Sequence, residues 1–394
     1  MQDQAAENTW EGALTKSSDI RDYVHGIRDG YRAGRINRRQ FAKGLGAVGL
    51  GLTAMPLGGQ VARAASEDHP TCFMWAGSEM DGFWQPYVDE FGELPRFSLF
   101  ADLEEAYAKL RGGFKPDVMM TCVSELVRWY DAGLLAPIDT ERLSNWPDII
   151  PALKDIDGTV RDGNRVFVPA DWGETTVVFR TDLAPEYVDP VTHSWGILWD
   201  PKYKGKLSIL DSLVDGVAVA ALYGGIDPWT MDDADIEKVR ALLTEQRELI
   251  KFYGQSGYDV DEALVAGELV AAATWTSSYY ILKDKGLPVA LMSPKEGALA
   301  WVCGLTIHAE TELVDMAHEA IDAFIDPVGR AFEMTEWGYG SANLKSFDLI
   351  DAETLDYMGL PRDPGPYLES RSMQVDMMNK EKIALMFEEV KAGF

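Results

Sequence analysis

The hydrophobic positions that follow residue 70 fall in short runs that alternate between two spacings. The runs "TCFMWAG", "RFSLF" and "PDVMMTC" are mostly apolar and short, which is typical of buried strands. Residues 86–91 and the runs "DLEEAYAKLRGG" and "SELVRWYDAGLL" between them have helical spacing, and the second begins with a capping Asp and ends at Gly. This alternation of strands and helices predicts parallel β-α-β units.

The second half of the chain continues this alternation after a long extended segment. "RVFVPADWGETTVVFRTD" predicts a strand-like crossing between two lobes, interrupted at "PADWG", and "KGKLSILD" predicts a new strand. "DIEKVRALLTEQRELIKFYG" predicts one long amphipathic helix, and "ELVAAATW" and "LPVALMSPKEGALAWVCGLTIHA" predict further strands. The remainder is predicted to be helical apart from the turn "EWGYGSAN". We therefore expect an α/β fold of two lobes joined by hinge crossings, with a central ligand cleft.

The segment before residue 65 has a different pattern. "GRINRRQFAKGLGAVGLGLTAMPLGG" combines a basic block with an apolar run that is too short to span a bilayer, which takes about 20 residues. Arg38 and Arg39, followed by Phe41, resemble the twin-arginine signal that exports folded proteins, and small residues at "VARAAS" suit a signal peptidase. We expect residues 1–64 to be removed and the remaining protein to reside in the periplasm.

Composition excludes several functional classes. The chain has 36 Lys and Arg against 64 Asp and Glu, a formal net charge of −28, which disfavours nucleic acid and anionic membranes and attracts cations. Its three cysteines (Cys72, Cys122 and Cys303) are widely spaced, and with only five His they give no metal-ligand pattern. No catalytic motif of the G-x-S-x-G or H-E-x-x-H type and no phosphate-binding loop occurs, so we expect no enzyme, no cofactor and no metal.

Six stretches are similar to the spermidine/putrescine-binding proteins of bacterial ABC importers. They are "WAGSEMDGFWQPYVDEFG", "AKLRGGFKPDVMMTCVSELVRWYDAGLLAPID", "WGETTVVFRTDL", "SWGILWDPKYKGKLSILD", "MSPKEGALAWVCGLTI" and "DAFIDPVGRAFEMTEWGYGSAN". The resemblance implies a two-lobed periplasmic binding protein that delivers its ligand to membrane permeases, and we expect it to be a monomer. One lobe is expected to comprise 65–172 with about 277–330, and the other about 173–276 with about 331–394.

The same resemblance implies where the ligand binds. In that family, carboxylates hold the amine groups and aromatic rings enclose the methylene chain, as expected for a desolvated ammonium ion. The ten implied positions are Trp75, Ser124, Trp172, Glu174, Asp211, Asp215, Trp275, Ser278, Trp301 and Tyr339. Each also has a simpler interpretation, because a Trp after a strand is often part of the core and an Asp before a helix is often its N-cap.

Two departures from the family pattern leave the ligand open. Ser278 and Cys303 stand where some polyamine binders have Asp, while Glu174 adds a carboxylate in the crossing. We interpret this as favouring a ligand with only one strongly cationic end. A polyamine or related cationic amine is the first choice, and a zwitterionic amine such as a betaine or an amino acid is the alternative. Ferric iron bound by Tyr279 and Tyr280 is less favoured, because no His or carboxylate is placed beside them.

Overall fold

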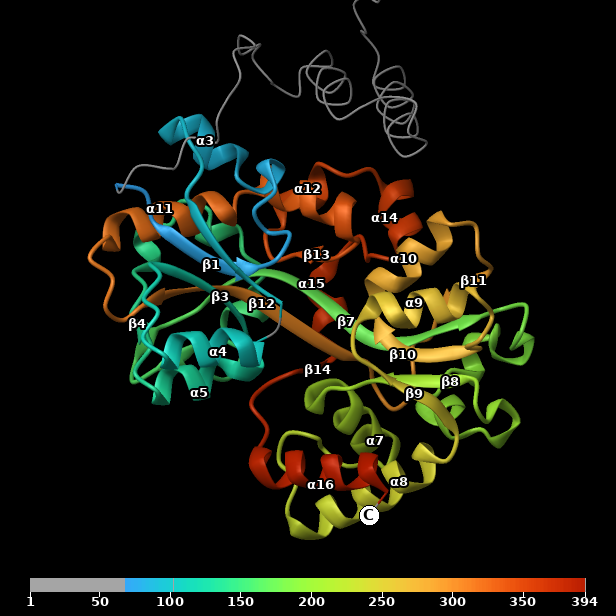
Figure 1. Cartoon of the computed structure of the whole chain (residues 1–394). Coiled ribbons are helices and arrows are strands. Elements are labelled where there is room, and N and C mark those ends of the chain that lie inside the picture. The colour runs from blue at the N-terminus through green and yellow to red at the C-terminus, as the bar shows by residue number, and fades with distance from the viewer. Residues whose placement is uncertain (1–67, 102, 394) are drawn as a thin grey trace, which may run out of the picture. The chain divides into compact units, whose positions relative to one another are not determined.

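One mixed sheet runs through the computed structural model of the protein, which describes residues 68–101 and 103–393 (Figure 1). The predicted export signal lies outside the described residues. The main path of the sheet is β2 (Arg96–Phe100), β1 (Thr71–Trp75), β3 (Val118–Cys122), β12 (Leu299–His308), β7 (Val168–Arg180), β10 (Ala271–Trp275), β8 (Leu207–Leu210) and β9 (Ile250–Gly254). Short strands extend it: β4 (Leu135–Ala136), β11 (Val289–Leu291), β13 (Gly340–Ser341) and β14 (Ser372–Met373), while β5 (Val160–Arg161) and β6 (Asn164–Arg165) form a separate pair.

The two ends of this sheet are parallel and its middle is antiparallel. β1 pairs in parallel with β2 and β3, and β8 pairs in parallel with β9 and β10. The long strands β7 and β12 run antiparallel to one another between these two groups and lie side by side in Figure 1. The predicted β-α-β units are therefore confirmed, and β7 and β12 join them.

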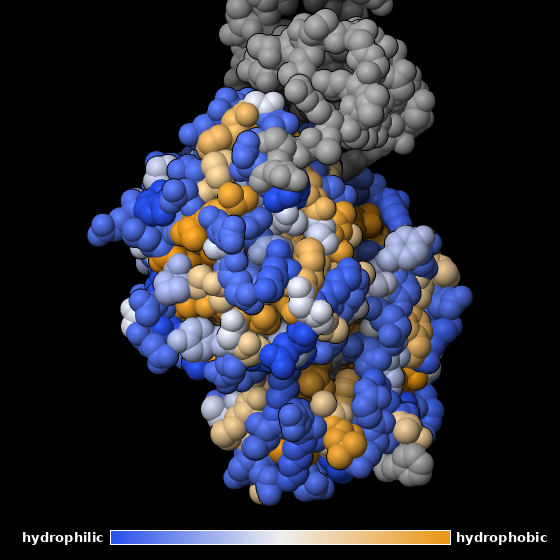
Figure 2. Space-filling model, turned by 60° about the vertical axis from the view of Figure 1, so that its left-hand side comes forward, coloured by the Kyte–Doolittle hydropathy of each residue, from blue (hydrophilic) through white to orange (hydrophobic). Residues whose placement is uncertain are grey.

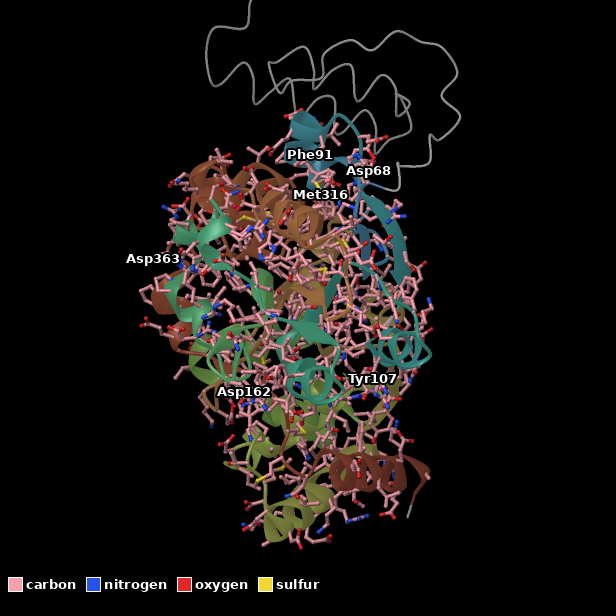
Figure 3. The ribbon with its side chains drawn as sticks, turned by 90° about the vertical axis from the view of Figure 1, so that its left-hand side faces the viewer. Asp68, Phe91, Tyr107, Asp162, Met316 and Asp363 are labelled. Atoms are coloured by element: carbon pink, nitrogen blue, oxygen red, sulfur yellow. A yellow bond between two sulfur atoms is a disulfide. The ribbon has the colours of Figure 1, made fainter. Side chains whose placement is uncertain are left out.

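Helices cover both faces of each parallel group. Beside β1–β3 lie α3 (Gln85–Phe91), α4 (Leu103–Arg111), α5 (Leu126–Asp131), α6 (Pro151–Lys154), α11 (Val314–Phe324) and α12 (Pro327–Trp337). Beside β8–β10 lie α7 (Ala218–Tyr223), α8 (Asp233–Arg247), α9 (Gly257–Val265), α10 (Thr276–Asp284) and α16 (Lys380–Ala392). The remaining helices are α13 (Lys345–Asp348), α14 (Ala352–Met358) and α15 (Pro364–Glu369). Figure 3 shows Phe91 of α3 near Met316 of α11, where both residues pack against the same core.

Three apolar cores form around this sheet. The first core surrounds β1–β3 and contains Phe73 and Met119. The second and third cores lie on opposite faces of the β7–β10–β8 region, because alternate residues of one strand enter different cores: Val177 enters the second and Val178 the third. A sheet buried on both faces needs apolar residues at nearly every position, which explains the continuous apolar runs in these strands.

The cores also show how distant segments of the chain combine. Met334 and Leu368 pack in the first core, although the expected lobe boundaries assigned both to the other lobe. Leu282 packs in the third core and Met292 in the second, although both were expected in the lobe that contains the first core. The chain therefore returns to the first group of strands only with β12. Tertiary packing rather than local pattern sets this division, because helices α12–α15 find their apolar partners around β1–β3.

Two local predictions were wrong, and the interruption predicted in β7 is only a local irregularity in a continuous strand. The strand β7 is continuous through "PADWG", because β12 and β13 hydrogen-bond its two edges there. The pairing shifts from Cys303–Asp171 to Gly304–Pro169, so Ala170 of β7 has no register partner in β12 and "PADWG" contains a local irregularity. Only Gly fits at position 304, since a Cβ there would lie 2.2 Å from the Val168 carbonyl oxygen. The long helix predicted over "DIEKVRALLTEQRELIKFYG" ends at Arg247, and Ile250–Gly254 instead pairs with β8 as β9. The run "SELVRWYDAGLL" was predicted to be a second capped helix, but α5 begins at Leu126 after a 3₁₀ turn and has no side-chain N-cap.

One face of the described part of the chain can be followed in a space-filling view. Figure 2 shows hydrophilic side chains over most of one face, with apolar side chains in small areas between them. Within 68–101 and 103–393, no helix has both the length and the apolar character needed to cross a membrane.

Candidate functional site

Aromatic residues gather where β7 and β12 cross between the cores. The ring of Trp301 in β12 lies directly over Gly173 of β7, where a Cβ would approach it to 2.3 Å. Tyr339, just before β13, meets Trp301 edge to face with ring centroids 4.7 Å apart, and Trp337 lies 6.2 Å from Tyr339. The predicted residues Trp301 and Tyr339 are therefore neighbours, and Trp337 joins them although the sequence analysis did not select it.

A second group of predicted residues lies at the end of β10 and the start of α10. Trp275 is half-buried, and its ring lies within van der Waals reach of Gly257 at the start of α9. Ser278 is fully buried, and its hydroxyl lies 3.1 Å from that of Thr274. The hydroxyl of Ser277 donates to that of Tyr339 at 3.3 Å, which joins this group to the aromatic residues of the crossing.

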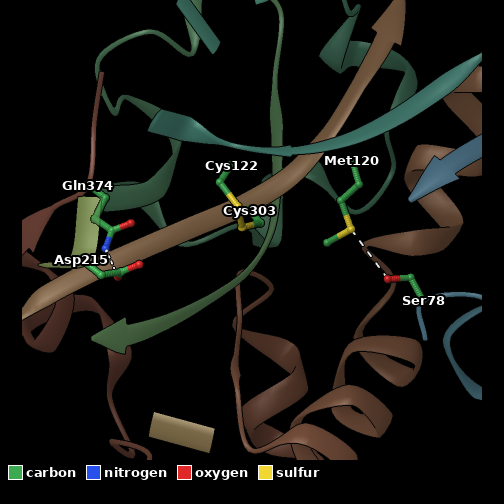
Figure 4. The surroundings of a disulfide bond; sticks show 6 residues. All are labelled: Ser78, Met120, Cys122, Asp215, Cys303 and Gln374. Atoms are coloured by element: carbon green, nitrogen blue, oxygen red, sulfur yellow. Dashed lines mark hydrogen bonds between the residues drawn. A yellow bond between two sulfur atoms is a disulfide. The ribbon is translucent and has the colours of Figure 1, made fainter. Parts of the chain in front are cut away.

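Asp215 is buried beside the same crossing. Its Oδ1 accepts hydrogen bonds from the hydroxyl of Thr175 and from Nε2 of Gln374, the latter at 2.9 Å (Figure 4). Thr175, which binds Asp215, is the register partner of Trp275 where β7 pairs with β10. Asp215 and Trp275 are therefore both connected to the same residue of β7. The sequence analysis predicted Asp215 but not Gln374, which follows β14 and comes from 159 residues further along the chain.

A disulfide joins Cys122 at the end of β3 to Cys303 in β12 (Figure 4). The two residues are direct register partners of neighbouring antiparallel strands. The sequence analysis did not pair them, because three widely spaced cysteines allow several pairings. The third, Cys72, is completely buried in the first core, and this burial raises the pKa of its thiol, so it cannot easily form a reactive thiolate.

Two of the predicted carboxylates already have cationic partners. Glu174 forms an ion pair with Arg371, whose guanidinium also lies 3.9 Å from the ring centroid of Tyr367. Asp211 forms an ion pair with Lys391 at 2.6 Å and accepts from Nε2 of Gln255 at 2.8 Å. Neither cation was expected near the site, because Arg371 and Lys391 are far from their partners in sequence and only the fold brings them there.

The other three predicted residues occupy different surroundings. Trp172 packs in the first core, is 1% exposed and donates from Nε1 to the carbonyl of Ser341. Trp75 at the end of β1 is half-buried and packs on Phe100 with ring centroids 4.9 Å apart. Ser124 is buried in the 3₁₀ turn after β3.

A buried ionic cluster lies close enough to Tyr339 to affect its pKa. Arg330 and Glu333 of α12 form an ion pair that is essentially inaccessible to solvent. Burial raises the pKa of Asp171 in β7, and the nearby carboxylate of Glu333 raises it further. Burial also raises the pKa of Tyr339 to about 12, and Asp171, Glu333 and Asp261 contribute to the increase. The Tyr339 hydroxyl is therefore a neutral hydrogen-bonding group surrounded by carboxylates.

Six carboxylates in all are buried among the described residues, and their charge partners divide them. Glu125 pairs with Lys380 at 2.5 Å, Glu174 with Arg371 and Glu333 with Arg330, while Asp171 lies beside this last pair. Asp215 and Asp261 have no ion pair to a Lys, Arg or His within residues 68–101 and 103–393. A buried carboxylate without a cation is costly, so these two positions are the best candidates to bind one.

A metal site finds no support in this part of the chain. No group of three or more His, Cys, Asp or Glu side chains among the described residues is arranged to hold a metal ion. Tyr279 and Tyr280 point to different partners, since the hydroxyl of Tyr279 accepts from Lys283 and that of Tyr280 donates to the Thr335 carbonyl. A hollow of about 240 Å³ is lined by residues 155–160 and includes none of the predicted site residues.

Comparison with known proteins relates the chain to one family. The family model for bacterial extracellular solute-binding proteins matches residues 101–357. The spermidine/putrescine-binding periplasmic protein of Salmonella typhimurium is 26% identical over 321 residues, which cover 80% of this chain and 89% of that protein. The putrescine/agmatine-binding protein of Pseudomonas aeruginosa is 25% identical over 307 residues, with 73% and 80% covered. The structure of PotD, the spermidine/putrescine ABC transporter substrate-binding protein of Streptococcus pneumoniae, superimposes with a TM-score of 0.69 at 17% identity, covering 82% of this chain and 98% of that one.

Proposed function

The chain belongs to the family of bacterial extracellular solute-binding proteins, and from this premise we propose that it captures a small cationic amine for an ABC importer. Polyamines are the first candidates, because the relatives from Salmonella typhimurium and Pseudomonas aeruginosa are named for spermidine, putrescine and agmatine. In this proposal the protein is a transport component that binds its ligand without changing it and passes it to a membrane permease.

The observation that carries the proposal is the state of Asp215. Asp215 is 4% exposed, and among the described residues its carboxylate accepts only from neutral donors, the Thr175 hydroxyl and the Gln374 amide. An ammonium group would supply the missing positive charge and a charge-assisted hydrogen bond. The rings of Trp275 and Trp301 near the same crossing would add cation–π attraction of roughly 0.5–2 kcal/mol.

A thermal-unfolding screen tests the ligand class. Putrescine, spermidine, glycine betaine and glutarate would each be added to the protein expressed from residue 65. A ligand that binds only the folded state at a hundredfold excess over its Kd stabilises it by about 2.7 kcal/mol. We expect a clear increase in Tm with putrescine or spermidine and none with glutarate. Stabilisation by the dicarboxylate and not by the amines would overturn the proposal.

Export through the twin-arginine route is the second part of the proposal. It is supported by the Arg38–Arg39 motif and by the Cys122–Cys303 disulfide, since disulfides persist in oxidising compartments such as the periplasm. Replacing Arg38 and Arg39 by Lys keeps the charge but removes the guanidinium groups, and we expect it to abolish periplasmic accumulation. Normal periplasmic yield of this double variant, measured by cell fractionation, would contradict this route.

A further inference from the structure

Asp261 of α9 is the second buried carboxylate without an ion-pair partner. It is 4% exposed, and its Oδ1 has no hydrogen-bond partner within the described residues. Desolvation by burial raises the pKa of this carboxyl to about 6, and the Ser278 hydroxyl opposes the increase. Burying a carboxyl group without a full set of hydrogen-bond partners costs free energy, so packing alone does not explain an Asp at this position.

The surroundings of Asp261 are the residues already gathered at the end of β10. Ser278, at the start of α10, is the neighbour that stabilises the charged form of Asp261. Gly257, one turn earlier in the same helix, packs against the ring of Trp275. Asp261 is also close enough to Tyr339 to raise the pKa of its phenol, and Tyr339 is hydrogen-bonded to Ser277.

Trp275 therefore adjoins two elements that are each connected to a buried carboxylate, the strand β7 and the helix α9. On one side it is the register partner of Thr175, whose hydroxyl binds Asp215. On the other side it packs on the helix that carries Asp261. This geometry points to Asp261 of α9 as a second ammonium-binding residue. The ligand is then a dication whose hydrocarbon chain lies along Trp275, and this inference rests on the proposed function.

The other charged groups near Asp261 do not neutralise it. Asp259 and Glu262 of the same helix raise its pKa, and Lys285, which follows α10, lowers it while pairing with Glu262 at 3.1 Å. The adjacent strand β10, with sequence AAATW, carries no titratable group, and the Tyr339 phenol is neutral. Because the pKa of Asp261 is about 6, part of its carboxyl group is still protonated at pH 6. A second ammonium ion would bind the ionised form and would therefore release this proton into solution.

Calorimetry with putrescine and with butylamine, which carries only one of the two ammonium groups, tests the inference. Wild type should bind putrescine more tightly than butylamine and release protons at pH 6, detected as a heat that depends on the buffer. Asp261→Asn should lower putrescine affinity at least tenfold, leave butylamine affinity within twofold and abolish the proton release. The control is Asp326→Asn, since Asp326 also has a raised pKa but caps α12 away from this group, and it should behave as wild type.

The outcomes separate the two proposals. If wild type binds no amine, the proposed function fails. If wild type binds putrescine but releases no proton at pH 6, or if Asp261→Asn keeps the preference for putrescine over butylamine, Asp261 is not a ligand-binding residue. The proton release is measured on the wild-type protein, so this test stands even if the Asn variant does not fold.

Discussion

At the scale of single residues, the charge partner of each buried acid decides what it can bind. From sequence, Asp211, Asp215 and Glu174 are all predicted to be carboxylates available to a cation. In the structure Lys391 and Arg371 neutralise Asp211 and Glu174, which leaves Asp215. The number of carboxylates in a motif is therefore a poor guide to the charge that a ligand meets.

The contrast between Asp215 and Asp211 gives the first prediction. Asp215→Asn should weaken amine binding by about 1.5–3 kcal/mol, the usual contribution of a hydrogen bond to a charged group. The matched variant Asp211→Asn should change it much less, because Lys391 and Gln255 already occupy that carboxylate. Calorimetric affinities of both variants for putrescine check this. Equal losses for the two variants, or an Asp215→Asn affinity within twofold of wild type, would contradict it.

The raised pKa of Asp261 predicts how stability changes with pH without ligand. Its pKa rises from 3.8 in the unfolded chain to about 6 in the folded protein, so the folded state binds more protons between these values. The stability contributed by this group is therefore present at low pH and is lost as the pH rises through about 6. At pH 7 the ionised, buried Asp261 should cost about 1–3 kcal/mol.

Asp261→Asn should accordingly increase the free energy of unfolding at pH 7, and the gain should shrink towards pH 4. Urea unfolding of wild type and variant across this range measures the difference. A variant that is less stable than wild type at pH 7 would show that the ionised carboxylate is stabilised in the folded protein.

At the scale of secondary-structure elements, the strands β3, β12 and β7 form the junction of the molecule. β12 pairs with β3 on one side and with β7 on the other, and the Cys122–Cys303 disulfide fixes its register against β3. Gly304 permits the local shift that lets β12 follow both neighbours. This junction lies next to the aromatic residues and to Asp215, so its rigidity bears directly on the site.

The disulfide should stabilise this junction measurably. It closes a loop across a sequence separation of 181 residues, and removing such a crosslink costs typically 2–4 kcal/mol. We expect the double variant Cys122→Ser/Cys303→Ser to lose stability by about this amount in urea unfolding. Dithiothreitol should lower the stability of wild type to the same degree and leave the double variant unchanged. A wild type that is insensitive to the reductant would contradict a disulfide in the folded protein.

At the scale of the whole described unit, two groups of parallel strands have their own cores and share the crossings. The first core encloses β1–β3, and the second and third enclose β8–β10. The polar contact between Lys380 of α16 and Glu125 after β3 connects residues on the two sides. Separate cores that are joined by a few strands can move relative to one another, as hinge closure around a ligand requires.

Ligand should therefore draw the two groups together. Solution scattering of the protein from residue 65, with and without saturating putrescine, should show a smaller radius of gyration in the bound state. The Asp215→Asn variant at the same putrescine concentration serves as the control and should show a smaller change, because less ligand is bound. An unchanged radius with bound putrescine would count against a hinged cleft.

The sequence by itself determined the elements and the family. Strands β1, β2, β3 and β10 were predicted from continuous apolar runs, and α4 from its Asp and Gly boundary signals, because these signals are local. The motifs around Trp301 and Tyr339 indicated the family and placed aromatic residues that the structure brings near the crossing. Local pattern misled where two structures compete for the same residues, as in Ile250–Gly254, which pairs with β8 instead of extending α8.

Only the tertiary structure decided which charges meet. Arg371 reaches Glu174 across 197 residues of sequence and Lys391 reaches Asp211 across 180, and no local signal encodes such pairs. The same holds for the pairing of Cys122 with Cys303 and for Asp261, whose helix gave no sign that it would pack beside Ser278. Electrostatic partners depend on distances of a few ångströms between segments that are remote in the chain, and those distances are set by packing of the cores.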